Sequence, residues 1–176
     1  MLFRSLRYMY LKDLQRSDYA NAKHVLLLGD FLESANSVLV STFRDALDIV
    51  AKKFLIKVRS HPICPLTEQQ LGNLTDSVSF DNLADLLEQA SVVITTAASS
   101  SAAEAVVLGI PTIVVLDAGS LNYSPFRQSN NVYMVESAKQ LADLLKDLSR
   151  LYGYPTRSIF CIDPNYSRWR TEFSST

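Results

Sequence analysis

Three consecutive serines, Ser99 to Ser101, follow an apolar run and open a stretch with helical periodicity. Small side chains at the start of a helix let an anion approach the first-turn amides, and hydroxyl groups add donors. Glu104 lies one turn after Ser100, on the same side of the predicted helix. A carboxylate there could accept hydrogen bonds from ribose hydroxyls. The spacing predicts a site for a phosphorylated nucleoside, while N-capping serines and a solvated glutamate remain the alternative.

Two other loops carry residues suited to the same site. Gly29 and Asp30 follow the first apolar run of the chain, and His61 follows the second, in the sequence Arg-Ser-His-Pro. His24 begins an apolar run and therefore belongs at the opposite edge of a sheet, which leaves His61 as the only plausible imidazole at this site. A loop role for His61 and a helix-capping role for Asp30 stay open.

Several common sites are excluded by the motifs that the sequence lacks. The phosphate-binding sequences GxxxxGK[ST] and GxGxxG do not occur, and no nucleophile stands with a base at a recognisable spacing. His61 and Cys64 are three residues apart, but no further ligands accompany them. We therefore expect no metal and no cofactor. The sequence does not fit a phosphoacceptor domain either, because Asp30 has no acidic neighbour.

Alternating strand-like and helix-like segments must position these loops. Short apolar runs predict strands and apolar residues at helical spacing predict the helices between them. Such alternation implies parallel pairing through right-handed crossovers, with helices on both faces. The sequence thus predicts an α/β fold, a doubly wound Rossmann-like parallel sheet of about six strands. The commonest order for six is 3-2-1-4-5-6, and ligands bind at the carboxyl ends of the strands. The predicted strands are 24–30, 54–58, 78–80, 92–96, 112–116 and 131–135; the predicted helices are 33–53, 67–72, 82–90, 99–108 and one beginning at Ser137.

The 176 residues suffice for one full-sized domain, with 48% hydrophobic and 20% charged residues. A net charge of -1 gives no basis for non-specific nucleic-acid binding. The longest apolar runs are too short to span a membrane, and two cysteines fit a reducing cytoplasm. We predict an N-terminal helix or linker (1–20), a nucleotide-binding domain (21–153) and a C-terminal tail (154–176). The amphipathic segment 2–15 allows at most peripheral membrane association, and otherwise packs on its own domain or a neighbour.

Two stretches carry a resemblance to a known family. The sequences KVRSHP (57–62) and ASVVITTAASSSAAEAVVLGIPTIVV (90–115) resemble the carboxyl-terminal, nucleotide-binding half of GT-B-fold glycosyltransferases. Bacterial surface-carbohydrate enzymes are the most similar, including sialyltransferase-like groups with His-Pro and Ser-Ser motifs. The tail FCIDPNYSRWR (160–170) resembles the end of such proteins, and the likeness spans about 24–170. UDP-sugar 2-epimerases have the same fold and a similar serine–glutamate helix, so the reaction stays open.

The resemblance implies a role for each candidate residue. His61 would be catalytic, contacting the donor phosphate and stabilising the departing nucleotide, and the donor would be a CMP-, CDP- or UDP-linked sugar. Glu104 would bind the ribose. The residues implied in nucleotide or phosphate binding are Gly29, Asp30, Ser99, Ser100, Ser101 and Glu104.

A GT-B enzyme has two Rossmann-like domains, and this chain has residues for one. We therefore expect a missing N-terminal acceptor domain or a partner chain, and little turnover by this chain alone. The segment 2–15 and the Arg168-Trp169-Arg170 sequence would meet the absent domain. The alternatives are half of a UDP-sugar 2-epimerase-like enzyme and a non-catalytic nucleotide-binding module.

Overall fold

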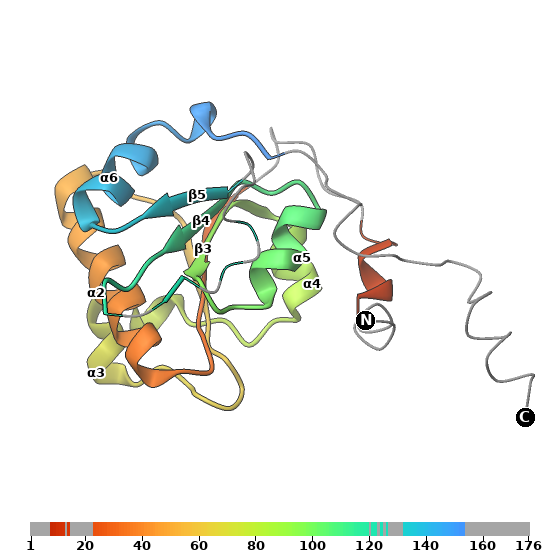
Figure 1. Ribbon diagram of the computed structural model, residues 1–176, viewed down its shortest axis with the longest axis horizontal. Coiled ribbons are helices and arrows are strands. Elements are labelled where there is room, and N and C mark those ends of the chain that lie inside the picture. The colour runs from red at the N-terminus through yellow and green to blue at the C-terminus, as the bar shows by residue number, and fades with distance from the viewer. Residues whose placement is uncertain are drawn as a thin grey trace, which may run out of the picture.

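One sheet of five parallel strands, in the order β2-β1-β3-β4-β5, forms the centre of the structure (Figure 1). The computed structural model describes residues 8–12, 14, 23–119, 121–122, 124, 126 and 132–153. The strands are β1 (His24–Leu28), β2 (Ile56–Arg59), β3 (Ala90–Thr96), β4 (Thr112–Val115) and β5 (Val132–Val135). The register places Val25 beside Ile56, and Ile94 beside Ile113.

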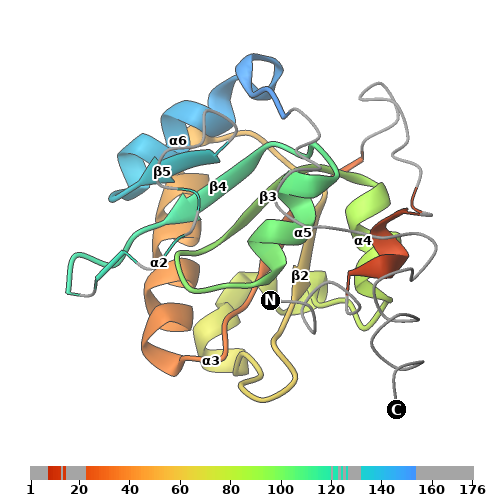
Figure 2. The same cartoon turned by 45° about the vertical axis from the view of Figure 1, so that its right-hand side comes forward.

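Helices cover both faces of this sheet. The α-helices are α2 (Glu33–Val50), α3 (Glu68–Leu71), α4 (Leu83–Glu88), α5 (Ser101–Val107) and α6 (Ala138–Lys146). The 3-10 helices are η1 (Met9–Lys12), η3 (Gly72–Ser77) and η4 (Leu148–Arg150). Figure 2 shows α2 and α6 on one face of the sheet and α4 and α5 on the other. The predicted doubly wound α/β fold is therefore confirmed.

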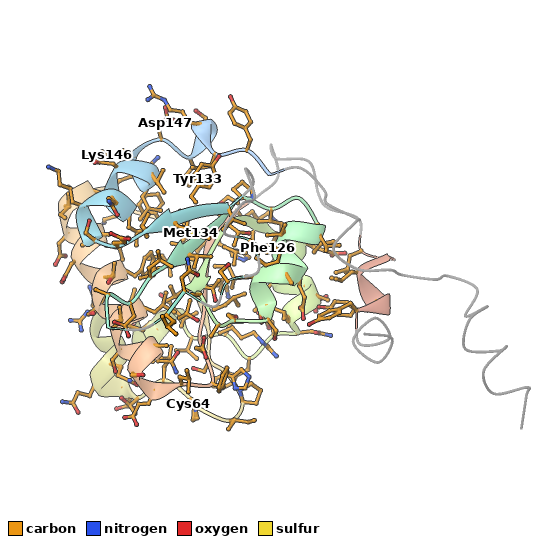
Figure 3. The ribbon with its side chains drawn as sticks, viewed as in Figure 1. Cys64, Phe126, Tyr133, Met134, Lys146 and Asp147 are labelled. Carbon is orange, nitrogen blue, oxygen red and sulfur yellow. The ribbon has the colours of Figure 1, made fainter. Side chains whose placement is uncertain are left out.

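Alternation along β1 explains why the core has two halves. Val25 and Leu27 pack in one cluster with apolar residues of α2 and α6, whereas Leu26 and Leu28 pack with those of α4 and α5. Successive side chains of a strand point to opposite faces, so a continuous apolar run fills both. A third, smaller cluster includes Phe126, which lies beside α5 (Figure 3).

The prediction of a strand at 78–80 is wrong, because the sheet has five strands where about six were expected. Val78 forms a single parallel bridge with Val58, and Ser79 N–H donates to the Val58 carbonyl at 2.8 Å. The Ser79 hydroxyl then bonds the Asp81 carboxylate, which turns the chain and leaves Phe80 95% exposed. Pairing therefore stops after one residue. The bridge lies beside β2, as the order 3-2-1-4-5-6 requires.

Helix ends differ from the prediction by a few residues. The helix predicted over 33–53 ends at Val50 because Ala51 takes a left-handed conformation, with φ 52°. The helix predicted over 99–108 begins at Ser101, since Ser99 N–H bonds the Thr96 carbonyl in a preceding turn. Ser137 caps α6 as predicted, with its hydroxyl accepting from Gln140 N–H.

The terminal segments are described only in part. Within the predicted helix 2–15, residues 8–12 and 14 are described, and they contain one 3-10 turn, η1. The tail 154–176, with Arg168-Trp169-Arg170, lies outside the described residues. None of the helices in the described part of the chain is long and apolar enough to cross a membrane.

Candidate functional site

A cavity of about 350 Å³ opens where β1, β2 and β3 reach their carboxyl ends. Three loops line it: one follows β1, one follows β2 and one joins β3 to α5. This is the edge at which α/β sheets hold ligands. The predicted site residues that the structure brings together here are Gly29, Asp30, His61, Ser99, Ser100 and Ser101.

Gly29 lets the first two loops approach closely. Its N–H donates to the Arg59 carbonyl at 2.9 Å. A Cβ on Gly29 would lie 3.2 Å from the backbone nitrogen of His61 and 3.3 Å from Oδ1 of Asn36. Both contacts are tighter than ordinary van der Waals contact, so glycine fits here because of the space rather than its φ.

Asp30 is 1% exposed and belongs to a hydrogen-bond network. Its carboxylate accepts from the Thr96 hydroxyl on β3 and from Leu32 N–H, the latter at 3.1 Å. The N-cap of α2 is Leu32, which has no side-chain cap, so the helix-capping role considered for Asp30 is wrong. Asp30 instead ties the end of β1 to the end of β3.

Asn36 is a site residue that the sequence analysis missed. It is 1% exposed on α2, and its Nδ2 donates to the Asp30 carbonyl at 2.9 Å and to the Cys64 carbonyl at 3.4 Å. These bonds join the loops after β1 and β2. The signal in the sequence was the position of Asn36, three residues before Leu39, which places its side chain on the buried apolar face of α2.

His61 lies in the loop after β2, where it forms an isolated bridge with Cys64, which Figure 3 labels. Its Nδ1 accepts from Ile63 N–H at 3.3 Å, which in the neutral ring places the proton on Nε2. The ring packs edge-on to Phe31, with 6.2 Å between the centroids. Nε2–H is therefore the group that can donate to an anionic oxygen.

The serines lie in the turn before α5 and in its first residue. Ser99 is buried at the edge of the cavity, and the Ser100 carbonyl accepts from Ala103 N–H at 3.1 Å. Ser100 is the N-cap by position but its side chain makes no capping bond. The alternative of a purely N-capping serine therefore does not hold for Ser100.

Arg59 is the one lysine or arginine among the described residues that line this cavity. Its guanidinium donates to the Asp81 carbonyl, which holds the side chain at the outer side of β2. A single cation beside neutral donors agrees with the near-neutral charge of the chain.

The structure does not bring Glu104 into this cavity, although its spacing from Ser100 predicted the same side of the helix. Its side chain is 2% exposed and accepts a hydrogen bond from the hydroxyl of Tyr10. The helix α5 therefore turns this carboxylate toward the N-terminal segment. Its role toward a ribose stays a prediction.

His24 lies at the opposite edge, as predicted, and is buried. Its Nε2 bonds the Leu86 carbonyl at 3.1 Å. Burial lowers the pKa of His24, the charge of Lys57 lowers it further, and the bond to Leu86 opposes both. The neutral ring is therefore favoured, and His24 has a structural role.

A second cavity of about 400 Å³ lies on the other side of the loop after β3. Its lining comes from the start of α2, the loop after β4 and the end of β5, and it includes Asp117 and Glu136. Ala98 lines both cavities, and none of the predicted site residues lines the second one. Within the described part of the chain, no three His, Cys, Asp or Glu side chains are grouped so as to hold a metal.

Comparisons with known proteins identify the family and support the fold. The profile of the glycosyltransferase family 28 C-terminal domain matches residues 34–152. A comparison with curated proteins found no match. Among solved structures, a Listeria monocytogenes protein described as a UDP-N-acetylglucosamine 2-epimerase is similar, with TM-score 0.60 and 12% identity over 96% of this chain and 52% of that one. The wall teichoic acid polymerase TagF, soaked with CDPG, has TM-score 0.50 and 15% identity over 83% of this chain and 38% of its own. The chain thus spans about half or less of these proteins, which share its fold.

Proposed function

This chain belongs to the glycosyltransferase family 28 C-terminal domain family, and on that premise we propose that it binds the nucleotide-sugar donor of a glycosyltransferase. The observation that carries the proposal is the cavity at the ends of β1, β2 and β3. It brings His61 and the serines of the β3–α5 loop to one place. Loops that follow three different strands supply neutral donors around a single space.

The cavity suits a phosphate group. Nε2–H of His61 and the hydroxyls of Ser99, Ser100 and Ser101 are donors, and Arg59 adds one positive charge. Buried Asp30 is engaged with Thr96 and Leu32, which orients its loop. We propose that Gly29 and Asp30 shape the nucleotide site through this loop, and that the donor is CMP-, CDP- or UDP-linked.

The reaction that fits these groups is displacement at an anomeric carbon. An acceptor hydroxyl oxygen forms a bond to that carbon as the bond to the donor phosphate oxygen breaks. The phosphate leaves with the bonding electron pair, and the hydroxyl proton passes to a base on the acceptor side. His61 would donate a hydrogen bond to the leaving phosphate and lower the barrier by stabilising its charge. The serine donors would position the same group.

The acceptor would be held by a second domain. The family profile is that of a C-terminal domain, and we propose that an N-terminal domain or a partner chain supplies the acceptor site. Little transfer is then expected from this chain alone. A role in bacterial surface polysaccharide synthesis, of a sialyltransferase-like kind, and a cytoplasmic location complete the proposal. The fold similarity to the Listeria protein favours half of a UDP-sugar 2-epimerase as the second candidate.

Titration of the chain with CMP, CDP, UDP and GDP, followed by amide NMR, tests the donor site. We expect one nucleotide to shift amide signals of the loops after β1, β2 and β3. His61→Ala should weaken that binding about tenfold through the lost phosphate contact. Ser41→Ala is the matched control for Ser100→Ala, because Ser41 is exposed on α2 and its hydroxyl bonds the Val38 carbonyl.

Absence of binding by all four nucleotides at millimolar concentration would overturn the proposal. Binding that both His61→Ala and Ser100→Ala leave unchanged would place the nucleotide elsewhere. To separate the two candidate reactions, the complete protein is supplied with a UDP-sugar, and release of UDP on addition of an acceptor is compared with conversion of the sugar to its 2-epimer.

A further inference from the structure

The N-terminal segment 8–12 packs against the face of the sheet that α4 and α5 cover. Tyr8 and Leu11 are both buried, and they belong to one apolar cluster with Leu86 of α4 and Ala105 of α5. Figure 2 shows η1 beside α4. A segment far from these helices in the sequence therefore packs against both of them.

Tyr10 brings a hydroxyl from this segment to the carboxylate of Glu104. The carboxylate is 2% exposed, and its helix neighbours Ala103 and Ala105 are buried and apolar. A carboxylate in such surroundings is costly unless hydrogen-bond donors meet it. The Tyr10 hydroxyl is one of those donors, so the segment stabilises Glu104 in its covered position.

This contact lies next to the cavity. Ser100 and Ser101 line the cavity, and Glu104 follows them by one turn of the same chain segment. Leu83 lines the cavity too, and it packs against the same apolar cluster as Tyr10. The Tyr10 hydroxyl therefore occupies the carboxylate of Glu104 within one helical turn of the serines that line the cavity.

We infer that the segment 8–12 is a displaceable cover, with the Tyr10 hydroxyl taking the place at Glu104 of a hydroxyl group of the nucleotide. The inference rests on the proposed function, because it needs a nucleotide in the neighbouring cavity. Binding then requires the segment to leave, so the apparent affinity falls in proportion to the uncovered fraction. The position of segment 8–12 therefore regulates the affinity for the nucleotide.

Removal of the Tyr10 hydroxyl tests the cover. Tyr10→Phe deletes the donor to Glu104 and should raise affinity for the tightest-binding nucleotide of the CMP, CDP, UDP and GDP panel about five- to tenfold. The affinity for the 2′,3′-dideoxy analogue of that nucleotide should rise less, because this analogue brings no ribose hydroxyl to Glu104. Tyr133→Phe is the matched control: its hydroxyl accepts from Tyr152 N–H at 2.9 Å on the far side of the sheet, and affinity should stay as in the wild type.

Tyr8→Ala combined with Leu11→Ala loosens the segment by another route and should give a similar gain. Thermal unfolding shows whether this variant folds, and Tyr10→Phe carries the test if it does not. Amide signals of residues 9–11 should shift when the wild type binds nucleotide. In Tyr10→Phe with Glu104→Gln, the preference for the ribonucleotide over its dideoxy counterpart should be lost.

The outcomes separate this inference from the proposed function. If no variant and no wild-type sample binds any nucleotide, the donor site itself is wrong. If the wild type binds and Tyr10→Phe binds equally well, the donor site stands and the cover is overturned. A nucleotide that binds Tyr10→Phe and not the wild type would support both.

Discussion

Asn36 and Asp30 form a ring of two hydrogen bonds: Asp30 N–H donates to Oδ1 of Asn36 at 2.7 Å, and Nδ2 of Asn36 donates to the Asp30 carbonyl at 2.9 Å. A side chain on α2 thereby satisfies both backbone groups of a buried loop residue. Buried backbone groups need such partners. The first loop of the candidate site is thus fixed from the helix that follows it.

Asn36→Ala should destabilise the fold by about 1–3 kcal/mol, because the buried backbone of Asp30 loses both partners. Urea unfolding measures the change. Ser41→Ala on the exposed side of α2 serves as the control and should change stability by less than about 0.5 kcal/mol. The ring of bonds would be unimportant if the two variants unfolded at the same urea concentration.

Gly29→Ala should disturb the candidate site more than the fold. The new methyl group meets the His61 backbone nitrogen at 3.2 Å, so the loop after β2 must move by a few tenths of an ångström. We expect the NMR signals of the His61 ring to shift and nucleotide affinity to fall severalfold. Gly119→Ala is a suitable comparison, since its Cβ would meet only the Asp117 side chain, at 3.4 Å or more. Unchanged His61 signals in Gly29→Ala would contradict the prediction.

Ala51→Gly should stabilise the protein by about 0.5–1 kcal/mol, because Ala51 holds the left-handed conformation that glycine adopts without a steric cost. The expected rise in Tm is about 1–4 °C. Differential scanning calorimetry measures it. Ala35→Gly, in the first turn of α2, should do the opposite, and stabilisation by both variants would refute the argument from backbone conformation.

Stability should decrease as the pH falls below about 6.5, the ordinary pKa of histidine. Burial lowers the pKa of His24 in the folded protein, so in this range the unfolded chain binds more protons than the folded one. The stability that neutral His24 contributes is fully present above pH 6.5, and it is lost as the pH falls through the lowered pKa of His24. His24→Gln can still donate to the Leu86 carbonyl, and its stability should depend less on pH between 7 and 5. Equal slopes for both proteins would contradict the assignment.

Much of the fold follows from local pattern. The run from Val25 to Leu28 is apolar at every position, which predicts a strand covered on both faces, and the two core clusters that share β1 confirm it. Residues 78–80 (Val-Ser-Phe) also predict a strand, yet only Val78 pairs. The turn made by Ser79 and Asp81 decides that outcome, and such a contact is not visible in hydrophobic periodicity.

The candidate site was predictable to the extent that topology decides it. His61 and Ser100 follow different strands of one parallel sheet, so they meet at its carboxyl edge. Spacing on a helix also predicted the side for Glu104, but it says nothing of what packs there. The contact with Tyr10 links residues 94 positions apart, and Asn36 acts through the backbone of another loop. Both depend on tertiary packing.

Ala98 lines both cavities, so the two spaces have one boundary residue in common. A group that displaces Ala98 from one side therefore also changes the boundary of the other space. A larger side chain at position 98 would therefore alter the boundary of both spaces with one substitution.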